Sequence, residues 1–510
     1  MTLYEYSPLR FGYIRVFRLL PAVDHGSVLW GDFTLLNLHY VTRVKANEVD
    51  DRPPSRSPAN YEALSYAWGK EDKPRVLSTS SGTIAITESL FSGLTRLRKT
   101  DVERFIWADA ICINQVDLEE KESQIGMMAD IYSLAARVIC DLGEATDDGD
   151  FEAMKVMKSA RTDWAWTIEA RAECRVALLQ LLTRPWFGRL WVVQEFFLAS
   201  RVALLLGREC FDWKSLMTAL LRTTDRTNAG TVMQNWPYLS LCTQRYKHDQ
   251  EFTREPLITN IQRYSYRKVG NPRDRYFALL AMSSDAFLGE LAPDYRSPIS
   301  VIIRRFGRHF LTASEGIKAL CVAGIHGVTC DNCSQGKCDN CLPSWMPNFT
   351  RVGFRRHPLL MDDRFLACGP VSARLQIDHR GDHLRLIGAY VDRVTNVLVS
   401  DDDDLPNPVT MCREAIEFFL CTDDPDSRNM RYPYTRQPKI DAAWQTICHH
   451  GSPGTASADL TSSLDRGFRY FHRSLLASTG KKSKSVPEAQ NPDDLQAQSV
   501  FFKAFSGKSR

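Results

Sequence analysis

The chain has 510 residues, 44% of them hydrophobic, and its 64 Lys and Arg residues against 61 Asp and Glu leave a formal net charge of +3. Because this length exceeds what one hydrophobic core usually supports, more than one domain is expected. A charge so close to balance argues against a nucleic-acid-binding protein and against a protein held on a membrane surface.

The N-terminal sequence lacks the features of a secreted protein. Arginines interrupt its short apolar pieces, and no continuous apolar stretch leads to a small-residue cleavage site. No apolar run in the chain reaches the ~18–20 residues that span a bilayer. Most of the 14 cysteines are scattered singly through apolar segments, which suits reduced thiols. The sequence therefore predicts a cytoplasmic protein without a membrane partner.

The first elements alternate strands with a helix. Residues 1–56 are interpreted as a lead-in segment that ends in a polar, proline-bearing stretch. Residues 61–68 are predicted to form a buried strand that leads to a turn at Gly69. Residues 75–87 follow as two short strands with a turn between them, and residues 88–100 carry leucines at helical spacing.

The following elements continue this alternation. Residues 104–113 form a continuous apolar run of strand length. Residues 119–136 predict one amphipathic helix with acidic residues in its first turn, where the helix dipole favours them. Short buried strands are predicted over 137–143 and 201–207, with a helix over 189–200 just before the second.

This alternation predicts the fold class. Residues 57–207 are expected to form a doubly wound α/β domain with a parallel sheet, in which ligands bind beyond the carboxyl ends of the strands. Residues 208–475 are predicted to be a mainly helical α+β region with a cysteine-rich loop at 330–341. The polar residues 476–510 predict a disordered tail.

Three blocks of the chain resemble the fungal heterokaryon incompatibility (HET) domain: YEALSYAWG, WADAICINQVDLEEKESQIGMMADIYSLAARVICDLG and RPWFGRLWVVQE. They have the order and spacing of that family over about 140 residues, which is far more specific than one short motif. Two later phrases, GNPRDRYFALLAM and CLPSWMPNF, resemble segments that follow the domain in large HET proteins. A glycine-rich block that such proteins often carry near the C-terminus has no counterpart.

The resemblance implies a role and a fold. HET proteins act in fungal non-self recognition, where fusion of unlike hyphae triggers growth arrest and cell death. The HET domain is distantly similar to the TIR domain, a flavodoxin-like α/β fold of immune signalling, and some TIR domains cleave NAD. WVVQEF resembles the TIR helix that carries the catalytic glutamate. The resemblance thus assigns the catalytic role to Glu195 and makes NAD a candidate substrate rather than a cofactor.

The chemistry of Glu195 is consistent with that assignment. Breaking a nicotinamide–ribose bond creates an oxocarbenium-like state, which a carboxylate near the ribose stabilises. Apolar neighbours on its helix, with Trp191 one turn earlier, are expected to desolvate this carboxylate and raise its pKa. The structural alternative is a buried ion pair of Glu195 with Arg184, Arg189 or Arg201.

Four further residues are candidate substrate contacts. Ser65 and Trp68 lie at the predicted end of the first strand of the domain, Asp109 lies near the end of another strand, and Trp191 lies on the helix of Glu195. The alternatives are a core role for Trp68 and, for polar groups in the loop after Asp109, helix capping. Capping is the favoured interpretation of Asn114 and Asp117.

Glu120 and Gln124 stand one turn apart on the predicted helix over 119–136. Residues at this spacing are neighbours on a helix surface and often bond to each other. We therefore expect a local hydrogen bond between them rather than a catalytic pair.

The motif CDNCSQGKCDNC supplies four thiols, at Cys330, Cys333, Cys338 and Cys341. Two such knuckles match the tetrahedral count that zinc prefers, which predicts a structural zinc. The gap between the knuckles is much shorter than in common zinc ribbons, so the site would be a compact loop. An iron–sulfur cluster or a reduced, metal-free loop are the alternatives, and His326 is a less favoured ligand.

Two functions therefore remain from the sequence. One is an effector enzyme whose HET domain hydrolyses NAD and so kills the cell. The other is a non-enzymatic module of the same death pathway, which self-associates through the HET domain or binds other incompatibility proteins. No nucleic acid is expected among its partners.

Overall fold

The computed structural model describes residues 2–24, 26–46, 48, 57–159, 168–223, 254–286 and 288–312, with shorter pieces at 241, 244–245, 319–320, 342–343, 345–350, 375–377 and 384–386. Contacts divide the chain into two compact units, Met1–Leu360 with Ser372–Leu386, and Met361–Val371 with Ile387–Arg510. The second unit lies outside the described residues. The predicted domain boundaries stay predictions.

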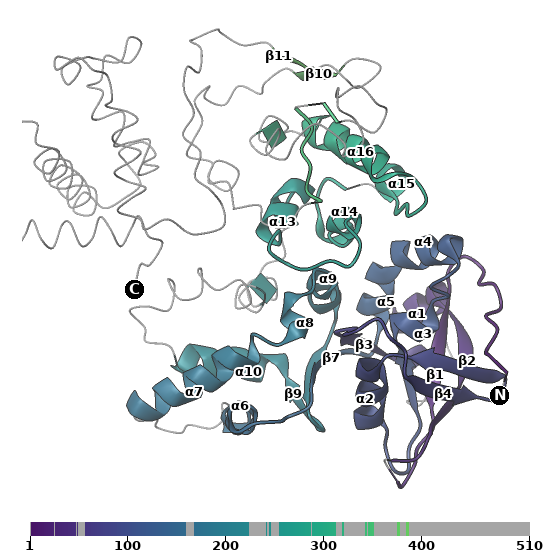
Figure 1. Ribbon diagram of the computed structural model, residues 1–510, viewed down its shortest axis with the longest axis vertical. Helices are drawn as coiled ribbons and strands as arrows, with labels where there is room; N and C mark the ends of the chain where they lie inside the picture. The colour runs from purple at the N-terminus through teal and green to yellow at the C-terminus, as the bar shows by residue number, and fades with distance from the viewer. Residues whose placement is uncertain are drawn as a thin grey trace, which may run out of the picture. The chain divides into compact units, whose positions relative to one another are not determined.

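The first unit is built on a nine-stranded sheet (Figure 1). Its strands are β1 (Tyr13–Leu19), β2 (Leu29–Asn37), β3 (Glu62–Tyr66), β4 (Arg75–Thr79), β5 (Gly82–Ile86), β6 (Arg104–Trp107), β7 (Arg137–Gly143), β8 (Val202–Leu206) and β9 (Glu209–Asp212). They lie in the order β5-β4-β2-β1-β6-β3-β7-β8-β9. A separate antiparallel pair is formed by β10 (Leu375–Ile377) and β11 (Leu384–Leu386).

The centre of the sheet is parallel, and its flanks are mixed, because β2 and β4 pair in parallel while the other flanking pairs are antiparallel. Strand β3 pairs in parallel with β6 and β7, and β7 pairs in parallel with β8. Strand β1 is antiparallel to β2 and β6, while β4–β5 and β8–β9 are antiparallel pairs at the two ends. The α/β class is thus confirmed, with a mixed sheet around a parallel centre.

Helices precede and follow these strands. They are α1 (Leu38–Lys45), α2 (Glu88–Leu97), α3 (Asp109–Cys112), α4 (Leu118–Gly126), α5 (Met128–Leu134), α6 (Asp148–Ser159), α7 (Ile168–Leu181), α8 (Pro185–Gly188), α9 (Trp191–Leu198), α10 (Trp213–Thr223), α13 (Leu257–Arg263), α14 (Asp274–Phe277), α15 (Leu288–Leu291) and α16 (Ile299–Thr312), with 3-10 turns η1 (Pro58–Asn60) and η2 (Leu280–Met282).

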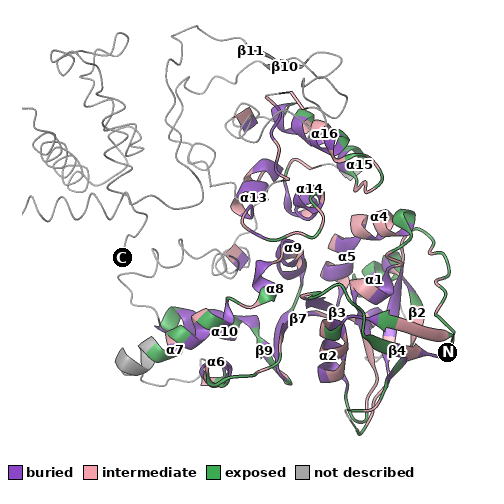
Figure 2. Ribbon diagram, in the orientation of Figure 1, coloured by how far each residue is buried: buried purple, intermediate pink, exposed green. Residues whose placement is uncertain are grey.

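Both faces of the parallel centre are covered. The Leu64 side chain of β3 points toward α2, because it would lie 3.8 Å from a Cβ added at Gly93 of that helix. The adjacent Ser65 side chain instead hydrogen-bonds Glu195 of α9. Because successive side chains of a strand point to opposite faces, α2 and α9 lie on opposite faces of the sheet. This double cover explains why every residue of β8 is buried and why β7 and α9 carry the buried colour in Figure 2.

The described residues before β3 contribute strands to the same sheet. They supply β1 and β2, whose antiparallel register runs from Tyr13 opposite Asn37 to Leu19 opposite Gly31. Leu3 and its neighbours also pair with Thr83 at the outer edge of β5. The sheet therefore extends well beyond the strands that alternation predicted.

Two predicted elements are divided in the structure. The apolar run 104–113 is strand only to Trp107, after which Asp109 begins α3. The single helix predicted over 119–136 is two helices, α4 and α5, that meet at Met127. Asp117 caps α4 by accepting from the amides of Glu119 and Glu120, as predicted.

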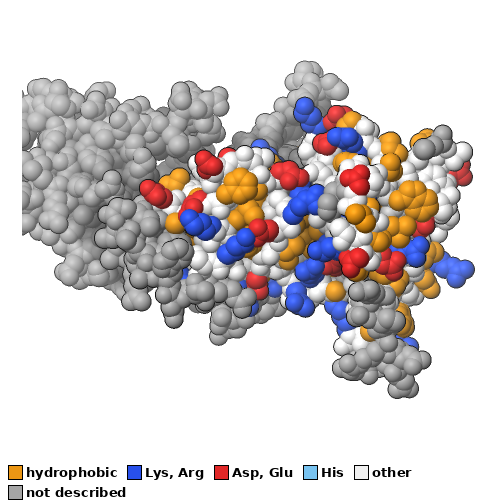
Figure 3. All heavy atoms as spheres, turned by 90° about the horizontal axis from the view of Figure 1, so that it is seen from below, with side chains coloured by type: hydrophobic (Ala, Val, Ile, Leu, Met, Phe, Trp, Pro, Cys, Tyr) orange, Lys and Arg blue, Asp and Glu red, His pale blue; other side chains and the backbone are white. Residues whose placement is uncertain are grey.

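The surface carries charges of both signs. Figure 3 shows basic and acidic side chains interspersed on the face seen from below. Two surface cavities of about 450 Å³ each lie beside α6 and β9 and between α15 and α16. Within the described ranges, no helix is long and apolar enough to cross a membrane.

Candidate functional site

The carboxyl ends of β3 and β6 bring polar side chains together. Ser65 and Tyr66 end β3, and Asp109 begins α3 just after β6. Because these strands are parallel neighbours, they end at the same edge of the sheet, where ligands bind in such folds. The predicted contacts Ser65, Trp68 and Asp109 are thus brought to one edge.

Glu195 reaches this edge from α9. Its carboxylate accepts a hydrogen bond from the Ser65 hydroxyl, and both residues are 1% exposed. The Trp186 indole of α8 donates to the same Ser65 oxygen at 2.7 Å. An indole N–H can only donate, so it occupies the Ser65 oxygen as an acceptor and leaves the hydroxyl proton for Glu195. Ser65 therefore orients the carboxylate.

The ion-pair alternative for Glu195 is not what the structure contains. Among the described residues, no salt bridge joins Glu195 to Arg184, Arg189 or Arg201. Arg184 pairs with Asp150, and Arg189 donates to the Tyr66 carbonyl. Glu195 is a buried carboxylate whose direct polar partner is a neutral hydroxyl.

This environment alters the acidity of Glu195. Burial raises its pKa to about 7, against smaller lowering effects of the Arg189 guanidinium and the Ser65 hydroxyl, and the Asp109 charge raises it further. A carboxyl group that is about half protonated near neutral pH can accept or donate a proton in a reaction. Acid–base chemistry is therefore available at this position.

Asp109 and Trp68 lie nearer the surface. The Trp68 indole donates to both Asp109 carboxylate oxygens, at 3.2 and 3.0 Å. Trp68 is 37% exposed, so it is not the core residue of the alternative interpretation. Burial raises the pKa of Asp109, while Arg189 and the indole lower it. Gly69 next to Trp68 has φ +73°, which agrees with a turn role for that glycine.

Two buried tyrosines complete the cluster. Burial, followed by the Asp109 charge, raises the pKa of Tyr66 well above its ordinary value. Burial, followed by the Glu195 charge, does the same for Tyr132 of α5. Both phenols therefore stay protonated and keep a donor hydrogen beside the carboxylates.

The remaining predicted contact, Trp191, has a different neighbour. It is half-buried at the start of α9, and its indole lowers the pKa of the Asp274 carboxyl of α14 against the raising effect of burial. Tyr295 donates to the same carboxyl at 2.6 Å. The structure thus links Trp191 to the region after β9, and its role toward a substrate stays a prediction.

Residues beyond the HET-like blocks hold α8 and α9 in place. Arg245 donates to three carbonyls at the C-terminal end of α9, those of Phe196, Phe197 and Ala199, at 2.6, 2.6 and 2.8 Å. Arg267 donates to the carbonyls of Phe187 and Arg189 before α9 begins. These contacts satisfy carbonyls that the helix ends leave open.

Sequence reasoning missed Arg245, Arg267, Trp186 and Tyr132 as parts of this site. Trp186 and Tyr132 stand inside the blocks that resemble the HET domain, so the resemblance was a signal for them. No local pattern marks the two arginines, because their acceptors are backbone carbonyls of distant residues.

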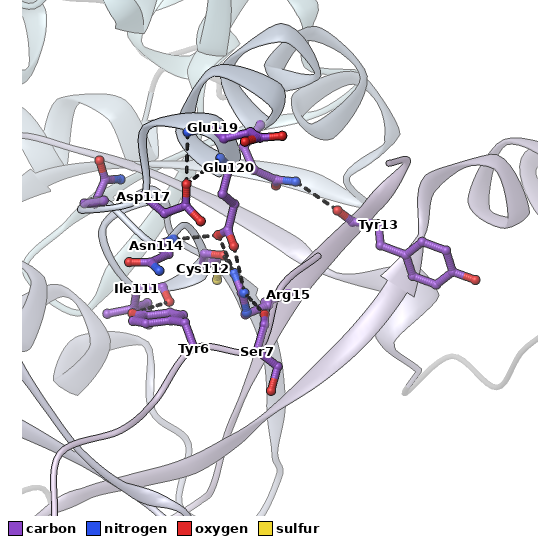
Figure 4. A network of polar contacts seen from close by, with 12 residues as sticks. Tyr6, Ser7, Tyr13, Arg15, Ile111, Cys112, Asn114, Asp117, Glu119 and Glu120 are labelled. Carbon is purple, nitrogen blue, oxygen red and sulfur yellow. Dashed lines mark hydrogen bonds and ion pairs between the residues drawn. The ribbon is translucent and has the colours of Figure 1, made fainter. Parts of the chain in front are cut away.

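A second buried network lies at α4 and is structural in character (Figure 4). Glu120 does not bond Gln124, contrary to the sequence-based expectation. It forms a two-pronged ion pair with Arg15 of β1, at 2.5 and 2.9 Å, and also accepts a hydrogen bond from the backbone N–H of Asn114. Gln124 donates to the Tyr13 carbonyl at 2.9 Å. Both side chains therefore fasten α4 to the N-terminal strand.

No part of the structure tests the predicted zinc. Cys330, Cys333, Cys338 and Cys341 lie outside the described residues, as does His326. In the described part of the chain, no three His, Cys, Asp or Glu side chains are grouped as metal ligands.

Comparison with known proteins finds a family similarity over the region that holds this edge. Residues 61–195 match the family model described as heterokaryon incompatibility protein (HET). The chain is 24% identical over 389 residues to heterokaryon incompatibility protein 6, OR allele, of Neurospora crassa. The similarity covers 62% of this chain and 57% of that relative, so the chain spans little more than half of it. No solved structure matches.

Proposed function

The chain is a HET domain-containing protein, with the domain at residues 61–195, and we propose that it acts in fungal non-self recognition as an effector of growth arrest and cell death. The name of the Neurospora relative supports the incompatibility role. The proposed activity is hydrolysis of NAD at the carboxyl edge of the parallel strands. The strand order β6-β3-β7-β8, second, first, third and fourth along the chain, supports kinship with the flavodoxin-like TIR fold.

One observation carries the enzymatic proposal. Glu195 is buried without an ion-pair partner among the described residues, yet it is oriented by the Ser65 hydroxyl at the edge where ligands bind. A fold tolerates such an unpaired carboxylate at a cost, which makes it a functional-site candidate. A carboxylate that served only to stabilise the fold would be expected to have a basic partner that balances its charge.

The chemistry follows from the position of Glu195. In its ionised form the carboxylate stabilises the positive charge that develops on the ribose as the bond to nicotinamide breaks. Nicotinamide leaves with the bonding electrons, and water adds to the ribose carbon. The carboxylate takes the proton of that water, and the products are nicotinamide and ADP-ribose.

A second function is favoured by the burial of Glu195. At 1% exposure, the carboxylate meets a substrate only after the residues over it move. A non-enzymatic module that signals by self-association needs no such movement. In that case Ser65, Trp186 and Glu195 stabilise the fold, and the death signal passes through the surface.

Two measurements on the full chain separate these functions. Purified protein is incubated with NAD at low and high protein concentration, and nicotinamide is measured by chromatography. Release by the wild type and by Glu173→Gln, an exposed control on α7, but not by Glu195→Gln supports the enzyme. Expression in a fungal host tests the effector role. Growth arrest without nicotinamide release favours the signalling module, and normal growth with verified folded protein contradicts both.

A further inference from the structure

The sheet has a switch point between β3 and β7. Strand β6, which follows β3 by way of α2, lies on one side of β3 in the sheet, and β7, which comes next in the chain, lies on the other side. The next connection, from β7 to β8, includes α9 on the face opposite to α2. Connections that leave two neighbouring strands toward opposite faces open a crevice at their carboxyl ends. Tyr66 and Asp141, paired in the register, mark this crevice.

Two arginines of the segment 184–189 reach the two sides of this crevice. Arg189 donates to the carbonyl of Tyr66, the last residue of β3. Arg184 donates to the carbonyl of Leu142 near the end of β7, at 2.6 Å. Gly143 permits this approach, because its φ is +95° and a Cβ there would lie 3.2 Å from the Arg184 guanidinium. The segment thus places two guanidinium groups at the carboxyl ends of adjacent parallel strands.

The two guanidinium groups differ in how their charge is balanced. Arg184 forms an ion pair with Asp150. Arg189 is half-buried, and in the described part of the chain no carboxylate lies within 4.0 Å of it; its side chain bonds the Tyr66 carbonyl. A guanidinium has five donor hydrogens, so most of those on Arg189 remain for an incoming group. The Arg189 charge acts on the Asp109 and Glu195 carboxylates without contacting them, and a partly buried cation with no carboxylate in contact can bind an anion.

We propose that Arg189 binds a phosphate group of a nucleotide at the β3–β7 switch point. Arg189 stands two residues before α9 begins, so an anchored phosphate places the rest of the nucleotide along the edge that holds Trp68, Asp109 and Glu195. The inference deepens the proposed function, because it names the group of the substrate that is recognised. It also rests on binding alone, so it is testable whether or not the bond is cleaved.

Binding to the full chain is measured by calorimetry with two probes, ADP-ribose and adenosine, which has no phosphate. The variant is Arg189→Gln. The matched control is Arg201→Gln, which removes an exposed arginine at the amino end of β8 and so at the opposite edge of the sheet. Loss of a charge-assisted contact predicts about a tenfold to a hundredfold weaker affinity of Arg189→Gln for ADP-ribose. Adenosine affinity stays unchanged, and the control matches the wild type for both probes.

Two results would overturn the inference. One is equal affinity of the wild type and Arg189→Gln for ADP-ribose, and the other is the absence of ADP-ribose binding by the wild type. If Arg189→Gln does not fold, Arg189→Lys keeps the charge but not the planar donor set, and an affinity equal to that of the wild type would again contradict it. ADP-ribose binding that depends on Arg189, without nicotinamide release from NAD, supports the phosphate site and rejects only the hydrolase.

Discussion

Changing either of two buried glutamates to glutamine is expected to shift the stability of the protein in opposite directions. Glu120 is held by Arg15 in a two-pronged ion pair, whereas Glu195 bonds the Ser65 hydroxyl and has no basic partner within 4.0 Å among the described residues. Glutamine keeps the size and an acceptor oxygen but removes the charge. The pair therefore compares a compensated buried charge with an uncompensated one.

The stability effect at Glu195 follows from its pKa, which burial raises from 4.5 to about 7. Below pH 4.5 the carboxyl is protonated in both folded and unfolded chains, and its burial carries no charge penalty. As the pH rises from about 4.5 through about 7, the unfolded chain ionises first, so the free energy of unfolding falls. The loss totals about 3 kcal/mol, since each pKa unit is worth about 1.4 kcal/mol.

Glu195→Gln removes this loss. The variant is expected to melt at the temperature of the wild type near pH 4.5 and above it near pH 8, by about 2–4 °C for each kcal/mol. Glu120→Gln leaves Arg15 buried without a counter-ion, which lowers the free energy of unfolding by about 3–5 kcal/mol near pH 8. Calorimetric or fluorescence melting of both variants across this pH range measures the contrast.

Two outcomes would refute this reasoning about Glu195. If Glu195→Gln melts well below the wild type near pH 8, as Glu120→Gln is expected to do, the carboxylate has a compensating partner and the ion-pair interpretation returns. Equal melting of wild type and Glu195→Gln at every pH would show that the carboxyl is not desolvated enough to alter its pKa.

Three further predictions concern other parts of the chain. Arg245→Met removes three hydrogen bonds to carbonyls of α9, and melting is expected to show a loss of about 3 kcal/mol or more in the free energy of unfolding; an unchanged melting temperature would contradict this. Gly31→Ala brings a Cβ within 2.1 Å of the Arg18 carbonyl oxygen across the β1–β2 pair. Denaturant titration is therefore expected to show a free energy of unfolding lower by at least about 1–3 kcal/mol, and wild-type stability would show that the two strands move apart without cost. Elemental analysis is expected to find about one zinc per chain, lowered by Cys333→Ser, whereas metal-free protein of equal stability would reject the site.

Local sequence patterns determined much of the α/β centre. Continuous apolar runs marked β7 and β8, because strands covered on both faces have no polar side to display. The β4–β5 hairpin was predicted from its turn, where Gly82 has φ +144°. The α4–α5 division escaped the pattern because apolar residues continue through Met127, and the spacing of apolar residues does not mark the end of one helix and the start of the next.

The tertiary structure alone decided which polar groups meet. Ser65 and Glu195 are 130 residues apart, and Arg15 and Glu120 are 105 apart. Sequence chemistry showed that Glu195 stands among apolar neighbours, but it left open whether an arginine pairs with it. That choice depends on strand order and on which face of β3 each side chain takes, and these are set by the packing of the whole sheet rather than by any local pattern.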